Sequence, residues 1–132
     1  YAQMYLDHEL KKFDLSSGLV HIFAEILKND GISQKKIVQD LKLDKSTVSK
    51  AIKKLEEKKY IEKKMNRNDK REYLLFYTLK AEKIRIDFFK ILKSWTNILL
   101  KDFSKEKYQI FLKILDKSRT NALSHFLIKD IK

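Results

Sequence analysis

Apolar residues recur every three or four positions along most of the chain, and this spacing predicts amphipathic helices. In the segment "DKSTVSKAIKKLEEK", for example, the apolar side chains share one helical face. The same periodicity continues through both ends of the sequence. It predicts helices over about 2–12, 17–29, 34–41 and 45–58, a long helix over about 79–100, and a last helix from about 105.

Four of these helices share a start signature, in which a capping residue has one apolar residue before it and another four positions after it. The capping side chain accepts a hydrogen bond from a free backbone N–H, and the apolar pair fixes how the chain enters the helix. We therefore expect a helix to begin directly after each capping residue. These residues are Ser16, Ser33, Asp44 and Ser104.

The pattern changes to strict alternation between residues 60 and 78, which predicts a β-hairpin. Polar residues 66–70 separate its two alternating segments and form a charged tip. Upstream, only residues 42–44 separate the third and fourth helices, a spacing typical of a helix-turn-helix. The predicted fold class is mainly α with a small β-hairpin (α+β), a winged helix-turn-helix.

We interpret residues 1–132 as a single chain with a winged helix-turn-helix lobe at about 30–80. Two glycines and no proline agree with helices joined by short turns. The segments 1–14 and 100–132 are more apolar than a lone small domain needs, so we expect them to be dimerisation helices. The helix at about 79–100 would link them to the lobe.

The formal net charge is +12, which points to a polyanionic partner. Residues 42–71 contain twelve Lys or Arg and five Asp or Glu, a net charge of +7 that leaves +5 for the rest of the chain. The positive charge is thus concentrated around the fourth helix and the hairpin. A lysine-rich composition alone would not produce this concentration.

Several function classes lose support. The chain has no cysteine, which excludes disulfides and thiolate chemistry and fits a cytoplasmic location. No apolar run approaches the ~20 residues of a membrane span, so no membrane partner is expected. His8, His21 and His125 offer no metal-ligand spacing, and no nucleophile, paired carboxylates or phosphate-binding glycine loop is visible. We predict no enzyme activity, no metal and no cofactor.

The chain begins with Tyr1 rather than Met, so we expect a few residues to precede it.

The segment from residue 32 to 82 resembles the MarR family of bacterial transcriptional regulators. "DKSTVSKAIKKLEEKKYIEK" is similar to that family's recognition helix and first wing strand, and "DKR" at 69–71 is similar to its wing-tip D-x-R. The flanking helices match the family in order and length. The resemblance implies a homodimer that binds pseudo-palindromic double-stranded DNA and regulates transcription, as a repressor or as an activator.

A DNA major groove about 12 Å wide admits one α-helix, which enters by its N-terminal end. The outward face of the fourth helix carries short hydroxyls in its first turn, which allow close approach of the backbone. Lys50 can reach a guanine edge, whereas Lys53 and Lys54 are expected at phosphates. Ser33 and Gln34 start the third helix, where Ser33 either meets a phosphate or serves only as a cap. The expected DNA-binding residues of the helices are Ser33, Gln34, Lys45, Ser46, Thr47, Ser49, Lys50, Lys53 and Lys54.

Arginine is scarce in this chain, yet Arg67 and Arg71 both fall in the hairpin tip. A narrow minor groove favours inserted arginine, and the resemblance assigns that role to Arg71, with Asp69 holding its orientation. Lys70 completes the expected DNA-binding residues of the tip, and the role of Arg67 stays open.

The last helix carries the expected dimer interface, whose residues are Phe111, Leu112, Leu115, Leu123, Phe126 and Leu127. The resemblance also implies a small aromatic effector bound between the lobe and the dimer helices. Packing alone explains most aromatic residues of the flanking helices, so no effector site is assigned. Two other functions stay open: a winged-helix protein–protein adaptor, and a basic membrane-surface protein.

Overall fold

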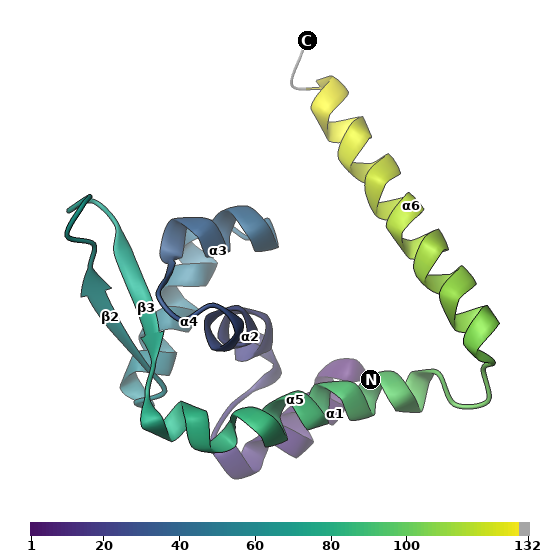
Figure 1. The fold of residues 1–132 in the computed structure, drawn as a ribbon, viewed down its shortest axis with the longest axis horizontal. Helices are drawn as coiled ribbons and strands as arrows, with labels where there is room; N and C mark the ends of the chain where they lie inside the picture. The colour runs from purple at the N-terminus through teal and green to yellow at the C-terminus, as the bar shows by residue number, and fades with distance from the viewer. Residues whose placement is uncertain (130–132) are drawn as a thin grey trace. The chain divides into compact units, whose positions relative to one another are not determined.

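The computed structural model describes the backbone of residues 1–129 and the side chains of residues 1–125. Its contacts group into two units, Tyr1–Trp95 and Thr96–Lys132. The first unit contains the three-helix core and the hairpin (Figure 1). None of the described helices combines the length and the apolar character needed to cross a membrane.

The first unit begins with α1 (Ala2–Leu10), which a 3₁₀ turn (Lys11–Phe13) extends. A second 3₁₀ turn (Ser17–Leu19) leads into α2 (Val20–Lys28). Two short elements complete the helix-turn-helix, α3 (Gln34–Leu41) and α4 (Lys45–Glu57). The long α5 (Leu79–Leu99) follows the hairpin.

The mixed fold class is confirmed, and so are the starts of α3 and α4. Ser33 accepts a hydrogen bond from the Lys36 amide, and Asp44 accepts one from the Thr47 amide. The expected side-chain cap at Ser16 is wrong, because this hydroxyl makes no capping bond. The Asp7 carboxylate, ten residues upstream, accepts from the Ser17 amide at 2.6 Å instead. A distant side chain thus satisfies this helix start.

The predicted hairpin is present as β2 (Ile61–Met65) and β3 (Tyr73–Tyr77), paired antiparallel. The sequence pattern missed a third strand, β1 (Ile32–Ser33), which pairs antiparallel with the other side of β3. Its two residues are too few for an alternating pattern to be visible. Gly31 precedes β1 with φ +85°, and a Cβ there would lie 3.2 Å from the Phe76 ring, so both conformation and space favour glycine.

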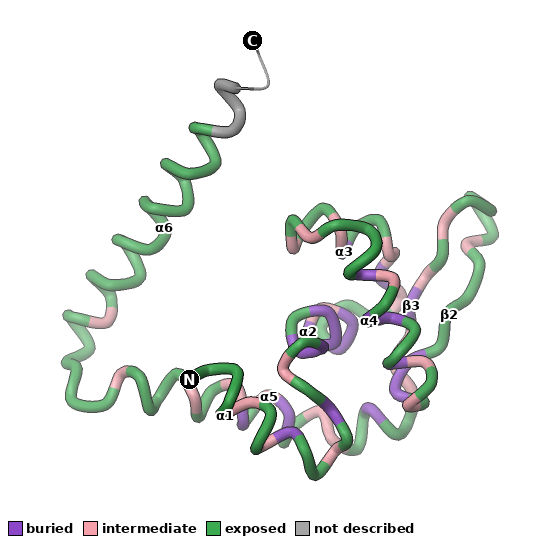
Figure 2. The backbone as a smooth tube through the Cα atoms, turned by 180° about the vertical axis from the view of Figure 1, so that it is seen from behind, coloured by how far each residue is buried: buried purple, intermediate pink, exposed green. Residues whose placement is uncertain are grey.

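The core of the first unit lies between α2, α4 and the inner side of the sheet, with α5 covering one end (Figure 2). Phe23 of α2 is fully buried and packs edge-on against Phe88 of α5, with ring centroids 5.1 Å apart. Leu10 and Leu15 bring the N-terminal segment into the same cluster. These contacts hold the helix-turn-helix, the hairpin and α1 as one body.

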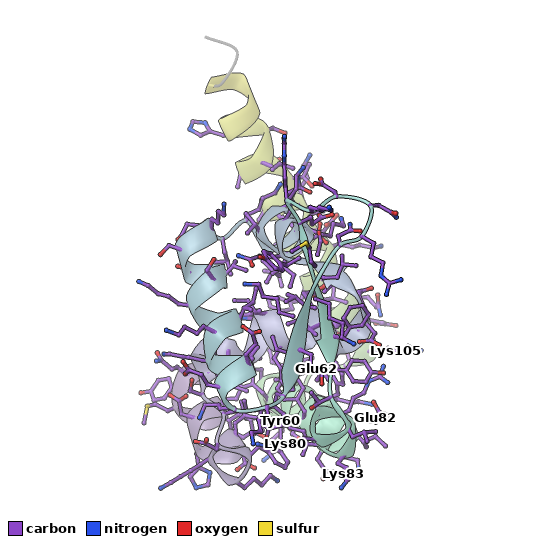
Figure 3. All side chains as sticks on the ribbon, turned by 90° about the vertical axis from the view of Figure 1, so that its left-hand side faces the viewer. Tyr60, Glu62, Lys80, Glu82, Lys83 and Lys105 are labelled. Atoms are coloured by element: carbon purple, nitrogen blue, oxygen red, sulfur yellow. The ribbon has the colours of Figure 1, made fainter. Side chains whose placement is uncertain are left out.

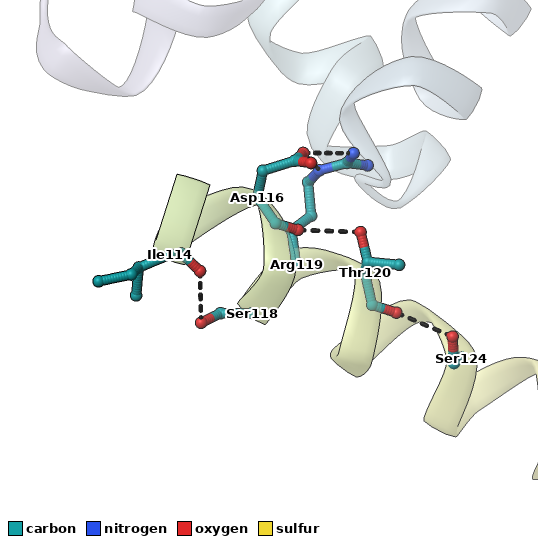
Figure 4. Close-up of polar contacts among 6 residues, drawn as sticks. All are labelled: Ile114, Asp116, Ser118, Arg119, Thr120 and Ser124. Carbon is teal, nitrogen blue, oxygen red and sulfur yellow. Dashed lines mark hydrogen bonds and ion pairs between the residues drawn. The ribbon is translucent and has the colours of Figure 1, made fainter. Parts of the chain in front are cut away.

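The second unit contains α6 (Lys105–Lys129), which Ser104 caps through the Lys107 amide. Several of its polar side chains bond within the helix (Figure 4). Arg119 pairs with Asp116 at 2.8 Å, and the hydroxyls of Ser118, Thr120 and Ser124 donate to carbonyls one turn earlier.

The apolar side chains of α6 are exposed instead. Of the expected interface residues, Phe111, Leu112, Leu115 and Leu123 are each between 41% and 49% exposed. The side chains of Phe126 and Leu127 lie outside the described residues. The role of this surface in dimerisation stays a prediction.

Candidate nucleic-acid interface

One face of α4 is buried, and this burial decides which residues the helix presents outward. Val48, Ala51, Ile52 and Leu55 are at most 5% exposed. These positions share one side of an α-helix, so the intervening residues point away from the core. The outward side carries Ser46, Lys50 and Lys53, all exposed.

The first turn of α4 is held by a compact cap. The Asp44 carboxylate accepts from the Thr47 amide at 2.8 Å and from the Thr47 hydroxyl at 2.5 Å. The hydrogen bond from the Thr47 hydroxyl lowers the pKa of Asp44 most, and the bond from the Thr47 amide lowers it further. The Thr47 hydroxyl is therefore already engaged in the cap, although the residue is exposed, whereas Lys45 and Ser46 are exposed and their side chains have no role in the cap.

A hydrogen bond joins the starts of the two helices of the helix-turn-helix. The Gln34 side-chain amide donates to the Ser49 hydroxyl oxygen at 2.7 Å. Since Ser49 accepts in this contact, its own proton remains available for an outside acceptor. The structure thus brings Ser33, Gln34 and Ser49, which the sequence separates by up to 16 positions, into one polar cluster beside the exposed first turn of α4.

The lysines of α4 supply unpaired positive charge. Within the part of the chain whose side chains are described, no hydrogen bond or ion pair engages the ammonium groups of Lys45, Lys50, Lys53 and Lys54. All four residues are exposed. Unpaired exposed ammonium groups can neutralise phosphates without breaking existing contacts.

The hairpin projects beside α3 and α4 and ends in a turn of defined shape (Figure 1). The Asn66 amide and side chain both bond to Glu72, which closes the loop at its base. The Asp69 carboxylate accepts from the Arg71 backbone amide at 3.0 Å. Asp69 therefore shapes the turn that carries Arg71, and the exposed Arg71 guanidinium forms no ion pair with the described residues.

At its other end, α4 finishes in a Schellman motif, with a lysine at the position that is usually glycine. Lys59 adopts φ +60°, its amide bonds the Glu56 carbonyl, and the Tyr60 amide bonds the Leu55 carbonyl. Lys80, from the start of α5, donates to the Lys58 carbonyl at 2.7 Å. A cation there also interacts favourably with the helix dipole.

Two side chains, Lys58 and Tyr60, tie this end of α4 to the N-terminal segment. Tyr60, 2% exposed, donates to the Phe13 carbonyl at 2.7 Å, and Lys58 pairs with Asp14 at 2.5 Å. The Lys80 ammonium lies 4.3 Å from the centre of the Tyr60 ring (Figure 3). Burial raises the pKa of Tyr60, whereas the Lys58 hydrogen bond and charge lower the pKa of Asp14. We call Asp14, Lys58, Tyr60 and Lys80 the base cluster.

Sequence reasoning missed the base cluster entirely. Its Lys58–Asp14 pair joins residues 44 positions apart, and nothing in the local pattern marks them. The only available signal was the tyrosine at the α4–β2 junction, where a polar end on a buried ring needs a hydrogen-bond partner.

A separate cavity of about 260 Å³ lies between α1, α2, α5 and the end of α3. Its walls are mostly apolar and include Leu6, Trp95 and Leu41, with the Glu25–Lys28 ion pair among the lining residues. Tyr5 contacts Trp95 with ring centroids 5.2 Å apart. The described residues contain no group of His, Asp or Glu that could hold a metal ion.

The helix-turn-helix, the three-stranded sheet and the projecting hairpin define a winged helix-turn-helix protein. The family model described as "MarR family" matches residues 15–73. The chain is 32% identical to the HTH-type transcriptional regulator BilQ of Clostridioides difficile (strain CD3), over 98% of this chain and 81% of that protein. The chain therefore belongs to the MarR family.

Solved structures agree with this assignment. A MarR protein from Peptoclostridium difficile is similar with a TM-score of 0.90 and 28% identity, covering 99% of this chain and 84% of that one. A MarR family transcriptional regulator from Listeria monocytogenes, complexed with a 26mer DNA, is similar with a TM-score of 0.86 and 31% identity. The match covers 95% of this chain and 83% of that one.

The Lys58–Asp14 pair should make stability depend on pH. The Asp14 pKa is lowered in the folded state from its ordinary 3.8, so the pair contributes stability well above that pH. The contribution is lost as pH falls through the folded pKa. We expect Asp14→Asn to unfold at lower denaturant concentration than the wild type near pH 7, with the gap narrowing below pH 4.

Lys58→Met provides the control for this prediction. In that background, Asp14→Asn should have little further effect, because the interaction is already absent. An equal effect of Asp14→Asn in both backgrounds, measured by urea unfolding, would show that Lys58 is not the relevant partner.

Proposed function

We propose that this protein is a sequence-specific regulator of transcription that binds double-stranded DNA as a homodimer. The observation that carries the proposal is the outward face of α4, with short hydroxyls at its start, unpaired lysines along it and a basic hairpin tip at its side. A helix of this kind fits a major groove and enters by its first turn. The Listeria relative in complex with DNA supports the same reading.

Different residues have different roles in this proposal. Lys50 faces outward beyond the first turn and reads a base edge, whereas Lys53 and Lys54 bind phosphates. The hydrogen bond from Gln34 holds the Ser49 hydroxyl at the groove. Ser33 caps α3, and it also lies at the helix start, where a phosphate can meet free backbone amides. Arg71, on the turn that Asp69 and Lys70 complete, enters the adjacent minor groove.

Dimerisation is the second part of the proposal. The exposed Phe111, Leu112, Leu115 and Leu123 form an apolar surface on α6, and each such side chain gains roughly 1.5–3 kcal/mol on burial. A second copy of the chain would cover this surface and place two recognition helices on one side of the duplex, about one helical turn apart. Ser118, Thr120 and the Asp116–Arg119 pair already bond within α6, so these groups need no partner from the second copy.

Ligand response is the third part. The cavity of about 260 Å³ joins α1, α2 and α5 to the end of α3, and an apolar or aromatic molecule suits its walls. A ligand in this cavity would contact Leu41 at the end of α3, the first helix of the helix-turn-helix. It would change DNA affinity only by binding one arrangement of these helices better than another.

The roles of Lys50 and Lys54 can be separated by mutation. Lys50→Ala should reduce the preference for the bound sequence over random duplex by roughly 1–3 kcal/mol, because a base contact is lost. Lys54→Ala should weaken binding to both duplexes alike, because a phosphate contact carries no sequence information. Fluorescence anisotropy titrations with both duplexes measure the two effects. Equal losses on both duplexes for both variants would refute the assignment of Lys50.

The dimer can be tested by placing a charge on α6. Leu115→Asp should give monomers in sedimentation velocity, with operator preference lost and a weak, salt-sensitive affinity for any duplex retained. Asn121→Asp adds the same charge at another exposed position of α6 and should leave the dimer intact. A wild-type chain that is monomeric at micromolar concentration and still binds its site tightly would contradict the proposal.

A further inference from the structure

The two sides of the hairpin differ, and strand pairing shows which residues lie on each. Lys63 is directly opposite Leu75, and Met65 is directly opposite Tyr73, so all four side chains share one side of the sheet. Leu75 is fully buried against the helices. This side of the hairpin, which we call the inner face, is therefore the one turned toward α2 and α4.

Toward the tip, the inner face leaves the core and becomes exposed. Tyr73 is 40% exposed and Met65 52% exposed, whereas Leu75, two residues from Tyr73 along β3, is completely buried. Neither Tyr73 nor Met65 belongs to the buried core of this unit. Their position beside the helix-turn-helix calls for another explanation.

Lys63 and Tyr73 form a diagonal cross-strand pair on the inner face. The Lys63 ammonium lies 4.3 Å from the centre of the Tyr73 ring, within the range of a cation–π interaction. No carboxylate among the described residues pairs with Lys63. The ring therefore restricts the lysine without neutralising its charge.

A phosphate strand is the feature of DNA that would meet this face. A protein with a helix in the major groove and a hairpin tip in the adjacent minor groove must straddle the backbone between the two grooves. The surface that faces this backbone lies between the recognition helix and the tip. On this chain, that surface is the inner face of the hairpin.

We propose that the inner face of the hairpin is a further phosphate-binding surface, in which the Tyr73 ring positions the Lys63 ammonium against the DNA backbone between the two grooves. The inference rests on the proposed function and adds a contact and a positioning residue to it. Lys63 binds the phosphate, and Tyr73 acts through Lys63 by limiting the conformations of its side chain.

The neighbouring lysine is a matched control. Lys64 is on the same strand and also lies over an aromatic ring, with its ammonium 5.1 Å from the centre of Phe76. It projects from the opposite side of the hairpin and pairs with Glu62 at 3.5 Å. The two lysines thus share residue type, strand and ring contact, and differ in the side they face.

The test measures how DNA affinity falls with salt. Each phosphate contact contributes about 0.9 to the slope of log affinity against log salt concentration. Lys63→Ala should make the full-length protein's slope on its selected duplex shallower by about 0.9 and lower the affinity several-fold. Lys64→Ala should leave the slope unchanged within error. Circular dichroism melting of both variants checks that each remains folded.

Tyr73 variants test the positioning role. Tyr73→Phe keeps the ring and should bind as the wild type does, whereas Tyr73→Leu should lose part of the affinity. In a Lys63→Ala background, Tyr73→Leu should have no further effect, because the side chain it positions is gone. A full effect of Tyr73→Leu in that background would contradict positioning through Lys63.

Failure of this inference can be told apart from failure of the proposed function. If the wild type binds its selected duplex but Lys63→Ala and Lys64→Ala change the slope equally, the inner-face contact is refuted and the proposed function stands. If the wild type binds no duplex, the proposed function is refuted, and the inner-face contact falls with it.

Discussion

The burial of one face of α4 is the constraint on which the rest of the interface depends. Because Val48, Ala51, Ile52 and Leu55 are held in the core, the helix cannot rotate about its axis. Its outward residues are therefore fixed in direction. A rotation of one residue, about 100°, would bury charged lysines without partners, and the energetic cost of such burial excludes it.

The two ends of α4 are fixed by different means. At its start, Asp44 binds Thr47, and Gln34 joins Ser49 to α3, so the residues of the proposed DNA-facing end are held by short polar contacts. At its end, the base cluster fastens the Schellman turn to the N-terminal segment through Lys58 and Tyr60. The end of α4 is thus coupled to the turn that follows α1, and α1 lines the 260 Å³ cavity through Leu6.

The sequence was sufficient wherever the information is local. The periodicity of α3 and α4, the caps at Ser33 and Asp44, and the alternation of β2 and β3 all depend on residues within a few positions of one another. The family likeness was also visible in a short segment, from Asp44 to the hairpin tip.

Features held together by distant residues could not be predicted. The strand β1 is only two residues long and exists because β3 offers it hydrogen bonds. The predicted cap at Ser16 is wrong because the Asp7 carboxylate, from another helix, accepts the hydrogen bond of the Ser17 amide. The Tyr73–Lys63 pair depends on strand register, which the alternation alone leaves free to slip.

The central claim is that α4 reads DNA sequence as one half of a symmetric pair. Selecting duplexes from a random pool with the wild-type protein, at ~150 mM salt, tests it most directly. The account predicts an inverted repeat with half-sites centred about 34–36 Å apart. It also predicts an affinity at least about 10³-fold above that for random duplex. A pool that shows no enriched sequence, from a protein that still binds DNA, would contradict it.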